Sequence, residues 1–228
     1  MSQTTILMPA RNAELTIRTS VRSALIQMGR NDKLFVYDDC SHDTTNSVVK
    51  SIDDPRISLF AGSDGAIGVA GGLNYLLERV ESEYVARLDA DDLFVPGHLR
   101  AARFWLRFKD LDVVGAQMIA FPLLRFKFFP VFKSSFDKSI LTRNPIAHPT
   151  VFGKASIFKK FRYRNIGLVE DFDLWNRLYL AGCSIGNSPH FATFYRCHSS
   201  QQTKDPLIHD ATKKILEEYR SQHVQFRT

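Results

Sequence analysis

Short apolar runs alternate with helix-like segments over the first 120 residues, and this rhythm restricts the fold more than any other feature of the chain. Apolar runs of about 4–8 residues between turn signals indicate buried strands, whereas apolar residues at every third or fourth position indicate helices. We expect strands at 5–8, 34–37, 57–60, 84–88 and 113–118, and helices at 13–28, 44–52, 69–80 and 96–108. Alternating strands and helices are typical of a mainly parallel, Rossmann-like sheet flanked by helices, so we predict an α/β fold.

The pattern changes after residue 120. The segment 123–133 interleaves aromatic residues with cations. Later elements are expected to be a loop with two prolines, a helix, a strand and an amphipathic helix, at 144–150, 170–181, 191–196 and 206–223. Because the chain has neither internal repeats nor a low-complexity linker, we predict one domain, 1–228, with a nucleotide-binding half at about 1–120 and an acceptor-facing half at about 121–228.

The net charge of +6 and the pI of about 9.3 suit an anionic partner. Nucleic acid, a phosphorylated substrate and an anionic membrane surface are the three candidates. Three cysteines at wide spacing give neither a disulfide framework nor a paired metal motif, which indicates a reducing cytoplasm. We expect no signal peptide, because the N-terminus lacks a basic region before an apolar one. Polar residues and prolines interrupt the apolar stretch 113–132, so we expect no transmembrane helix there.

Three carboxylates, Asp89, Asp91 and Asp92, crowd the end of the predicted strand 84–88. Like charges repel, so the cluster indicates a cation, and Mg²⁺ or Mn²⁺ takes carboxylate and phosphate oxygens. Ligands of open α/β sheets bind at this end of the strands. We expect Asp91 to bind the metal and Asp89 to point to the opposite side and face the nucleotide, with Asp92 as support. His198, after the last strand, could complete the metal shell.

Two earlier strand ends carry candidate nucleotide ligands. Pro9 ends the first predicted strand, and Pro9, Ala10, Arg11 and Asn12 bring a short turn to a helix N-terminus, which favours anions. A plain strand–helix turn is the alternative. Asp39 follows the second strand, where its carboxylate can accept hydrogen bonds from a base N–H or from ribose hydroxyls.

A glycine-rich segment that includes Gly68 and Asn74 begins the third predicted helix. Glycines at a helix start let the backbone approach a phosphate closely. The segment matches neither the dinucleotide fingerprint nor a phosphate-binding loop of the Walker type, so it predicts a nucleotide contact only in combination with its neighbours.

The C-terminal half carries the acid–base candidates. Glu170 and Asp171 begin the helix at 170–181, where a carboxylate either interacts with the helix dipole or serves as a general base in a fixed position. Trp175, one turn later, either stacks on a sugar ring or packs in the core. His148, in a turn framed by prolines, either hydrogen-bonds a donor or acceptor or is structural.

Taken in order, these motifs resemble the inverting family 2 glycosyltransferases with the GT-A fold, the fold of nucleotide-diphospho-sugar transferases. The matching stretches are Pro9-Ala10-Arg11-Asn12, Asp38-Asp39-Cys40-Ser41-His42-Asp43, the helix from Gly68 to Asn74, Asp89-Ala90-Asp91-Asp92, Asn144-Pro-Ile-Ala-His148-Pro149 and Glu170-Asp171-Phe-Asp-Leu-Trp175. The last two look like the bacterial polysaccharide and lipopolysaccharide branch of the family. The match covers residues 4–203, nearly the whole chain.

The resemblance implies a metal-dependent hexosyltransferase that moves a sugar from a nucleotide-diphosphate donor, a UDP-sugar, to a glycan or lipid-linked glycan in cell-surface polysaccharide synthesis. It implies that Asp171 is the catalytic base and that Asp91, assisted by His198, binds Mn²⁺ or Mg²⁺. The residues that it implies for the donor nucleotide are Pro9, Ala10, Arg11, Asn12, Asp39, Gly68, Asn74, Asp89 and Ala90. Those that it implies for the donor or acceptor sugar are His148, Glu170 and Trp175.

Two residues depart from the family pattern. Arg11 stands where the family usually has tyrosine, so a guanidinium plane would stack on the base or contact phosphate. Cys40 stands where the family usually has glycine, which predicts a turn without a left-handed residue at that position. Nucleotide preference is what these two departures leave open.

Two other classes of function remain at this stage. A sugar-phosphate nucleotidyltransferase would carry a glycine-rich basic loop near its N-terminus, and residues 9–14 have one cation and no glycine. A non-enzymatic nucleic-acid module would use the aromatics and cations of 123–133. That segment fits a membrane surface or an acceptor lipid equally well, or a partner subunit of a homodimer. We favour the lipid contact, expect no nucleic acid, and place the protein in the cytoplasm at the inner face of the membrane.

Overall fold

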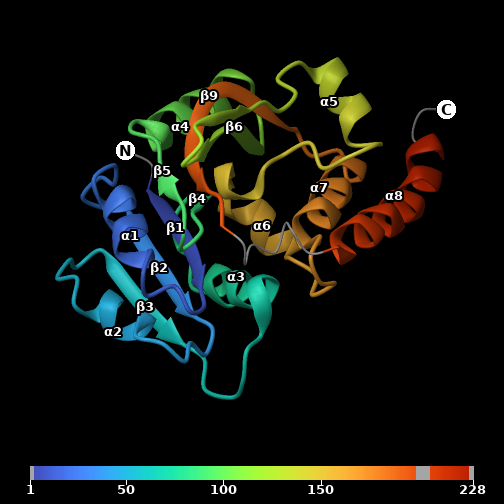
Figure 1. Cartoon of the computed structure of the whole chain (residues 1–228). Helices are drawn as coiled ribbons and strands as arrows, with labels where there is room; N and C mark the ends of the chain where they lie inside the picture. Colours follow the sequence, from blue (N-terminus) through green and yellow to red (C-terminus); the bar gives the residue numbers. More distant parts are fainter. Residues whose placement is uncertain (1–2, 199–205, 226–228) are drawn as a thin grey trace.

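Four parallel strands form the N-terminal part of the sheet in the computed structural model, which describes residues 3–198 and 206–225 (Figure 1). They are β1 (Thr4–Ala10), β2 (Lys33–Asp38), β3 (Ile57–Ala61) and β4 (Tyr84–Arg87), in the order β3-β2-β1-β4. The register places Ile6 of β1 opposite Leu34 of β2 and Ala86 of β4. The parallel strands predicted for this part of the chain are confirmed.

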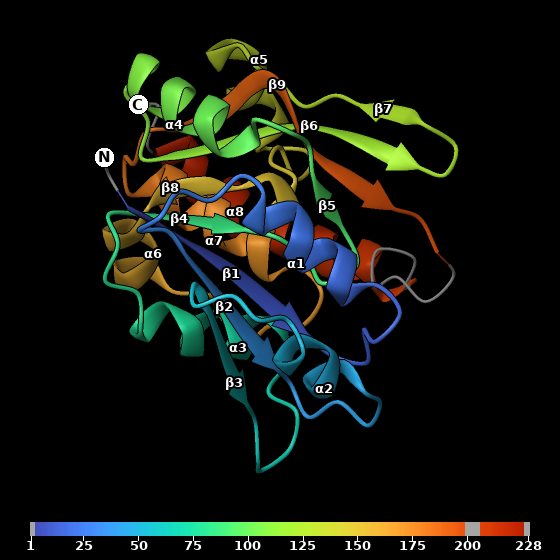
Figure 2. The same ribbon diagram turned by 90° about the vertical axis from the view of Figure 1, so that its left-hand side faces the viewer.

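Further strands extend the sheet beyond β4 (Figure 2). β8 (Phe152–Lys154) lies antiparallel between β4 and β6 (Val113–Phe121), and β9 (Ile185–Arg196) runs parallel to β6. β5 (Leu93–Phe94) pairs with β9, and β7 (Arg125–Lys127) pairs with β6, both antiparallel. Over the described residues four pairings are parallel and four antiparallel, so the sheet is mixed rather than mainly parallel.

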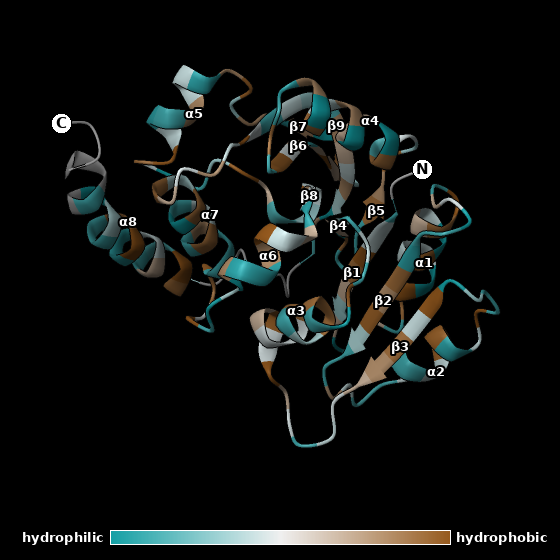
Figure 3. Cartoon of the chain, turned by 180° about the vertical axis from the view of Figure 1, so that it is seen from behind, coloured by the Kyte–Doolittle hydropathy of each residue, from teal (hydrophilic) through white to brown (hydrophobic). Residues whose placement is uncertain are grey.

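Helices cover both faces of the sheet. One core includes side chains of α1 (Ile17–Leu25), α2 (Thr45–Lys50) and α4 (His98–Phe108). The other includes side chains of α3 (Gly68–Glu78), α6 (Ala155–Phe161), α7 (Glu170–Leu180) and α8 (Leu207–Gln225). Alternation along β1 serves both, since Ile6 and Met8 belong to the first core and Leu7 to the second. The brown residues of β1, β2 and β3 in Figure 3 mark this apolar centre.

Two short elements, α5 (Lys133–Ser139) and the 3₁₀ helix η1 (His148–Thr150), lie between β7 and β8. Among the helices of the described ranges, none combines the length and the apolar character that a bilayer crossing requires.

The first strand and helix meet differently from the prediction. β1 continues through Pro9, which lies opposite Tyr37 in the parallel register, and α1 begins at Ile17 rather than at residue 13. The residues between them form a turn because their backbone N–H groups bind side chains of the next loop. Ala13 donates to Thr45 Oγ1 at 2.7 Å and Glu14 donates to Asp43 Oδ2 at 3.1 Å. The turn after β1 is therefore tied to the turn after β2.

Candidate active site

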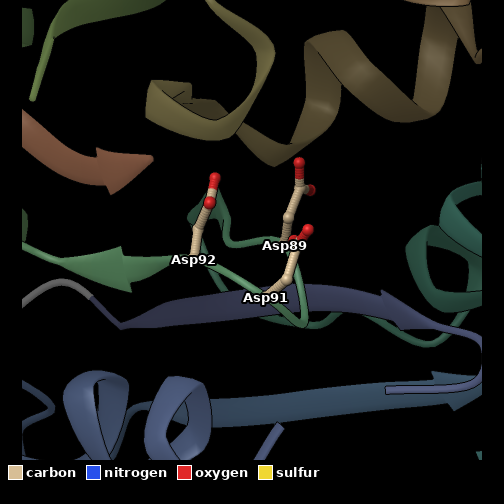
Figure 4. A group of neighbouring side chains, drawn as sticks. All are labelled: Asp89, Asp91 and Asp92. Carbon is tan, nitrogen blue, oxygen red and sulfur yellow. The ribbon is translucent and has the colours of Figure 1, made fainter. Parts of the chain in front are cut away.

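Residues 89–92 form a turn directly after β4, which we call the acidic turn. The backbone N–H of Asp92 donates to the carbonyl of Asp89 at 3.1 Å and closes it. Asp89, Asp91 and Asp92 each offer a carboxylate oxygen within 4.8 Å of the others, and the side chains leave the turn on one side (Figure 4). The expectation that Asp89 and Asp91 point to opposite sides is wrong: the turn places both carboxylates on one side, and side chains two residues apart would share a side in extended backbone as well. The turn gathers three carboxylates into one small volume.

The end of β9 holds the acidic turn in place. Asp92 is buried, and its Oδ1 accepts a hydrogen bond from the backbone N–H of Arg196 at 2.8 Å. The Arg196 side chain donates from Nε to the carbonyl of Asp91 at 2.8 Å. His198 Nε2 lies 2.8 Å from Asp91 Oδ2. The structure thus brings His198 to the carboxylate with which the sequence paired it, and gives Asp92 the supporting position.

A hard cation fits this group of oxygens. Asp92 Oδ2 is buried without a hydrogen-bond partner among the described residues. Burial, followed by the charges of Asp89 and Asp91, raises the pKa of Asp92 well above its usual value. Carboxylates that repel one another in a buried site are stabilised by a cation, and oxygen donors of this kind suit Mg²⁺ or Mn²⁺. Ala90, between Asp89 and Asp91, packs its side chain in the core and accepts a hydrogen bond from Ser20 Oγ through its carbonyl.

Arg87, the last residue of β4, is a buried cation beside this cluster that the sequence analysis missed. Its Nε donates to Asp89 Oδ1 at 2.7 Å, and its Nη1 is buried without a partner among the described residues. Burial raises the pKa of Glu170 and Asp171, and the positive charge of Arg87 opposes that rise. One guanidinium therefore lies within electrostatic reach of both the acidic turn and the start of α7.

Asp171 lies in the first turn of α7 and is held by two hydrogen bonds. Its Oδ2 accepts from Asn144 Nδ2 at 2.6 Å, and its Oδ1 accepts from the backbone N–H of Phe172 at 2.7 Å. Burial raises the pKa of Asp171, and these two bonds and Arg87 oppose the rise. Asp171 in turn adds to the raised pKa of Asp89, whose largest cause is burial. The carboxylate at the helix start therefore belongs to the same electrostatic site as the acidic turn.

Glu170, the neighbour of Asp171, is buried and contacts the loop that carries His148. Glu170 Oε1 lies 3.7 Å from His148 Nδ1, and His148 Nε2 lies 3.1 Å from the hydroxyl of Tyr163. Burial, with the charge of Asp171, raises the pKa of Glu170 to about 7. Trp175 is fully buried and meets the His148 ring edge-on, with centroids 5.9 Å apart. Of the two roles considered for Trp175, the structure shows core packing and not an exposed stacking surface.

Asp39 closes the N-terminus of α3. Its two oxygens accept hydrogen bonds from the backbone N–H groups of Ile67 at 2.7 Å and Gly68 at 2.9 Å. Gly68 has a φ of 74°, a conformation that glycine adopts without strain. Asn74 points elsewhere: its amide donates to the carbonyl of Tyr163 at 2.8 Å and accepts from the N–H of Tyr163 at 3.0 Å. Both polar atoms of Asn74 thus bind the backbone of Tyr163, an arrangement that favours a structural role over the expected nucleotide contact.

The turns after β1 and β2 lie against each other at the same sheet edge. Asp39 donates its N–H to the carbonyl of Ala10 at 2.8 Å, and Asn12 exchanges hydrogen bonds with Ser41 and His42. Arg11 is exposed at the rim. Cys40 has a φ of 54°, so the expected absence of a left-handed residue is wrong. The Asp38 side chain and carbonyl accept hydrogen bonds from residues 40 and 41 and hold this tight turn.

Comparison with known proteins places these features in a family. The family model described as glycosyl transferase family 2 matches residues 5–166. The Bacillus subtilis protein EpsE is 29% identical over 186 residues, covering 78% of this chain. The Escherichia coli protein WfaP, a UDP-Glc:alpha-D-GlcNAc-diphosphoundecaprenol beta-1,3-glucosyltransferase, is 28% identical over 203 residues, covering 87% of this chain and 79% of WfaP. The chain spans 66% of the length of EpsE, slightly less than two thirds.

Two solved structures share the fold. S. aureus TarS, residues 1–349, in complex with UDP-GlcNAc, superposes with a TM-score of 0.73 at 19% identity, covering 99% of this chain and 73% of TarS. The mannosyltransferase PcManGT from Pyrobaculum calidifontis, in complex with GDP-Man and Mn²⁺, gives a TM-score of 0.66 at 17% identity, covering 84% of this chain and 56% of PcManGT. The family match, which spans more than half of the chain, decides against the nucleotidyltransferase and non-enzymatic alternatives. The chain therefore belongs to glycosyl transferase family 2 and has the GT-A fold.

Proposed function

We propose that this protein transfers a sugar from a UDP-sugar to a hydroxyl of a glycan or lipid-linked glycan acceptor, in a single displacement that inverts the anomeric carbon. The observation that carries the proposal is the pair of acidic groups at one sheet edge, the acidic turn after β4 and Asp171 at the start of α7, with Arg87 in electrostatic reach of both. The UDP-sugar and lipid-linked acceptor are supported by what the names of TarS and WfaP state for those proteins.

Asp91 and Asp89 would hold Mn²⁺ or Mg²⁺, with His198 beside Asp91 and Asp92 as support. A bound divalent cation supplies Lewis-acid stabilisation for charge that develops on a departing diphosphate. PcManGT, whose structure contains Mn²⁺, supports this assignment. Asp39 and the turn from Pro9 to Asn12 would surround the nucleobase, because their polar groups lie at the same edge.

Asp171 would act as the general base that removes the proton from the acceptor hydroxyl. A general base must be ionised and within hydrogen-bond reach of its substrate. The hydrogen bonds from Asn144 and Phe172, together with Arg87, favour the ionised form and fix the direction of the carboxylate. The raised pKa that burial gives Asp171 makes it a stronger base than an exposed aspartate.

Two variants test the assignment in one assay of sugar transfer and nucleotide release, with Mn²⁺ or with a chelator. Asp171→Asn should lower transfer about 10²–10⁴-fold while calorimetry shows nearly unchanged UDP binding in Mn²⁺. Asp91→Ala should weaken metal-dependent UDP binding itself. Asp210→Asn, on α8, is the matched control and should keep full activity. Full transfer activity in both site variants would contradict the proposal.

A further inference from the structure

The exposed phenylalanines of the protein gather on two neighbouring segments. Among the described residues there are five of them, and each is 57–76% exposed. Phe104 and Phe108 lie on α4, while Phe126, Phe128 and Phe132 lie on or just after the β6–β7 hairpin. We call the surface made by residues 97–109 and 121–133 the basic aromatic face. In Figure 2, α4 and the hairpin occupy the same upper side of the molecule, and Figure 3 agrees.

The same two segments carry the net charge of the chain. They hold seven of its 30 lysines and arginines and none of its 24 acidic residues. The rest of the chain therefore has 23 cations against 24 acids, so the net charge of +6 comes from these two segments. Arg100, Arg103 and Arg107 line a surface groove of about 440 Å³ on α4 together with Phe104 and Phe108.

The two segments form one continuous surface. Lys109, at the end of α4, donates from Nζ to the carbonyl of Val131 at 3.0 Å. Phe126 and Phe128 pack against Phe191 of β9, with ring centroids 5.4 and 5.9 Å away. This packing fixes the hairpin against the sheet, so its outward side chains keep a defined orientation beside α4.

We propose that the basic aromatic face docks the protein on an anionic lipid bilayer. Exposed aromatic side chains on segments that also carry arginine and lysine suit a bilayer interface, where rings enter the headgroup boundary and cations meet anionic lipids. Leu123 and Leu124, at the hairpin tip, are exposed as well. Aliphatic side chains at a tip enter an acyl layer but cannot stack on nucleobases, which favours lipid over single-stranded nucleic acid. A second copy of the chain would bring one basic face against another, which charge repulsion opposes.

This surface also leads to the candidate active site. Phe121, directly before the hairpin turn, lies 4.7 Å from the Arg196 guanidinium, and Arg196 binds the carbonyl of Asp91. The docking does not depend on the reaction, but it would hold the acidic turn close to a lipid-linked acceptor.

Co-sedimentation of the full chain with vesicles tests the proposal. The protein should bind phosphatidylglycerol-containing vesicles, bind pure phosphatidylcholine vesicles weakly, and lose binding as salt increases. Arg100→Gln with Arg107→Gln should weaken binding about 30-fold, at about fivefold for each cation near the surface. Phe126→Ser with Phe128→Ser should weaken binding at high salt as well, where the apolar contribution remains. Leu15→Ser with Ile26→Ser, and Arg30→Gln with Lys50→Gln, remove exposed residues outside the face and should change nothing.

Three results would overturn the proposal. The first is equal binding to neutral and anionic vesicles, or none to either. The second is loss of binding in the control variants to the same degree as in the face variants, at unchanged melting temperature. The third is preference for single-stranded DNA over anionic vesicles in competition, or a stable dimer in solution that the phenylalanine variants dissociate.

Discussion

Glu170 is a buried carboxyl whose ionisation opposes folding, so its replacement by glutamine should stabilise the protein above neutral pH. Burial, with the charge of Asp171, raises its pKa from 4.5 to about 7. Because the folded state then holds the proton more tightly than the unfolded chain, the stabilisation is present below pH 4.5 and is lost as the pH rises through 7. A difference of about 2.5 units corresponds to roughly 3 kcal/mol in the free energy of unfolding.

Glu170→Gln keeps the shape of the side chain and removes the charge. At about pH 8 the variant should be more stable than the native protein by up to about 3 kcal/mol, and at about pH 4.5 the two should be nearly equal. For a chain of this size such a gain raises Tm by about 6–12 °C. Urea unfolding followed by circular dichroism, in chelator at both pH values, measures the difference. Glu81→Gln, at an exposed position before β4, should change neither value.

Two outcomes would refute this reasoning. A loss of stability at about pH 8 would mean that the Glu170 carboxylate is stabilised by Arg87 and His148 more than burial destabilises it. An equal gain at both pH values would mean that the gain comes from packing or helix propensity and not from the missing charge. Only a gain that grows with pH supports the view that this site holds an unfavourable charge.

Three other predictions concern other polar side chains. Arg87→Met should lower the free energy of unfolding in urea by about 3–5 kcal/mol. The loss should be larger at about pH 8 than at about pH 5, because the carboxylates around Arg87 are then ionised. A loss no greater than that of the exposed Arg79→Met would contradict this prediction. Asn74→Ala should lower the free energy of unfolding by about 1–3 kcal/mol, because it removes two hydrogen bonds to Tyr163, and should leave UDP binding unchanged in calorimetry. Weaker UDP binding at unchanged stability would mean that Asn74 contacts the donor. Burial lowers the pKa of His190 from 6.5 to about 4. Between these two values the unfolded chain binds a proton at His190 that the folded protein does not bind, so the free energy of unfolding decreases as the pH falls through this range. His190→Gln should reduce this acid sensitivity, and an unchanged slope of stability against pH would refute the assignment.

The parallel strands β1, β2 and β4 could be predicted because each lies inside the sheet and is largely apolar. β1, β2 and β4 have neighbours on both sides and helices on both faces, which leaves little room for polar residues. β8 has three residues and α6 has seven, too few for a helical or strand period to be visible. The sequence therefore contained no indication of β8, which lies antiparallel between β4 and β6. For this reason a mainly parallel sheet was expected.

The site residues that directly follow a strand could be predicted from the sequence. Those whose role depends on contacts with distant segments could not. Asp91 and His198 could be named as candidates because each follows a predicted strand. Arg87 interrupts an apolar run in the sequence. The carboxylates that explain a buried arginine there lie beside it only in the folded protein. Cys40 adopts a left-handed conformation because the Asp38 side chain and carbonyl hold the turn, and no pattern of residue types indicates that.

Charge balance links the two halves of the site. Asp89, Asp92, Glu170 and Asp171 all have a raised pKa with burial as the largest cause, and Arg87 lowers it in each. One guanidinium does not offset four carboxyl groups and Asp91, so the site favours further positive charge. A divalent cation at the acidic turn would lower the pKa of Asp89 directly and that of Asp171 through the same field. Donor binding with its cation would then increase the ionised fraction of the proposed base, and nucleotide binding and proton removal would be coupled through electrostatics without any movement of the chain.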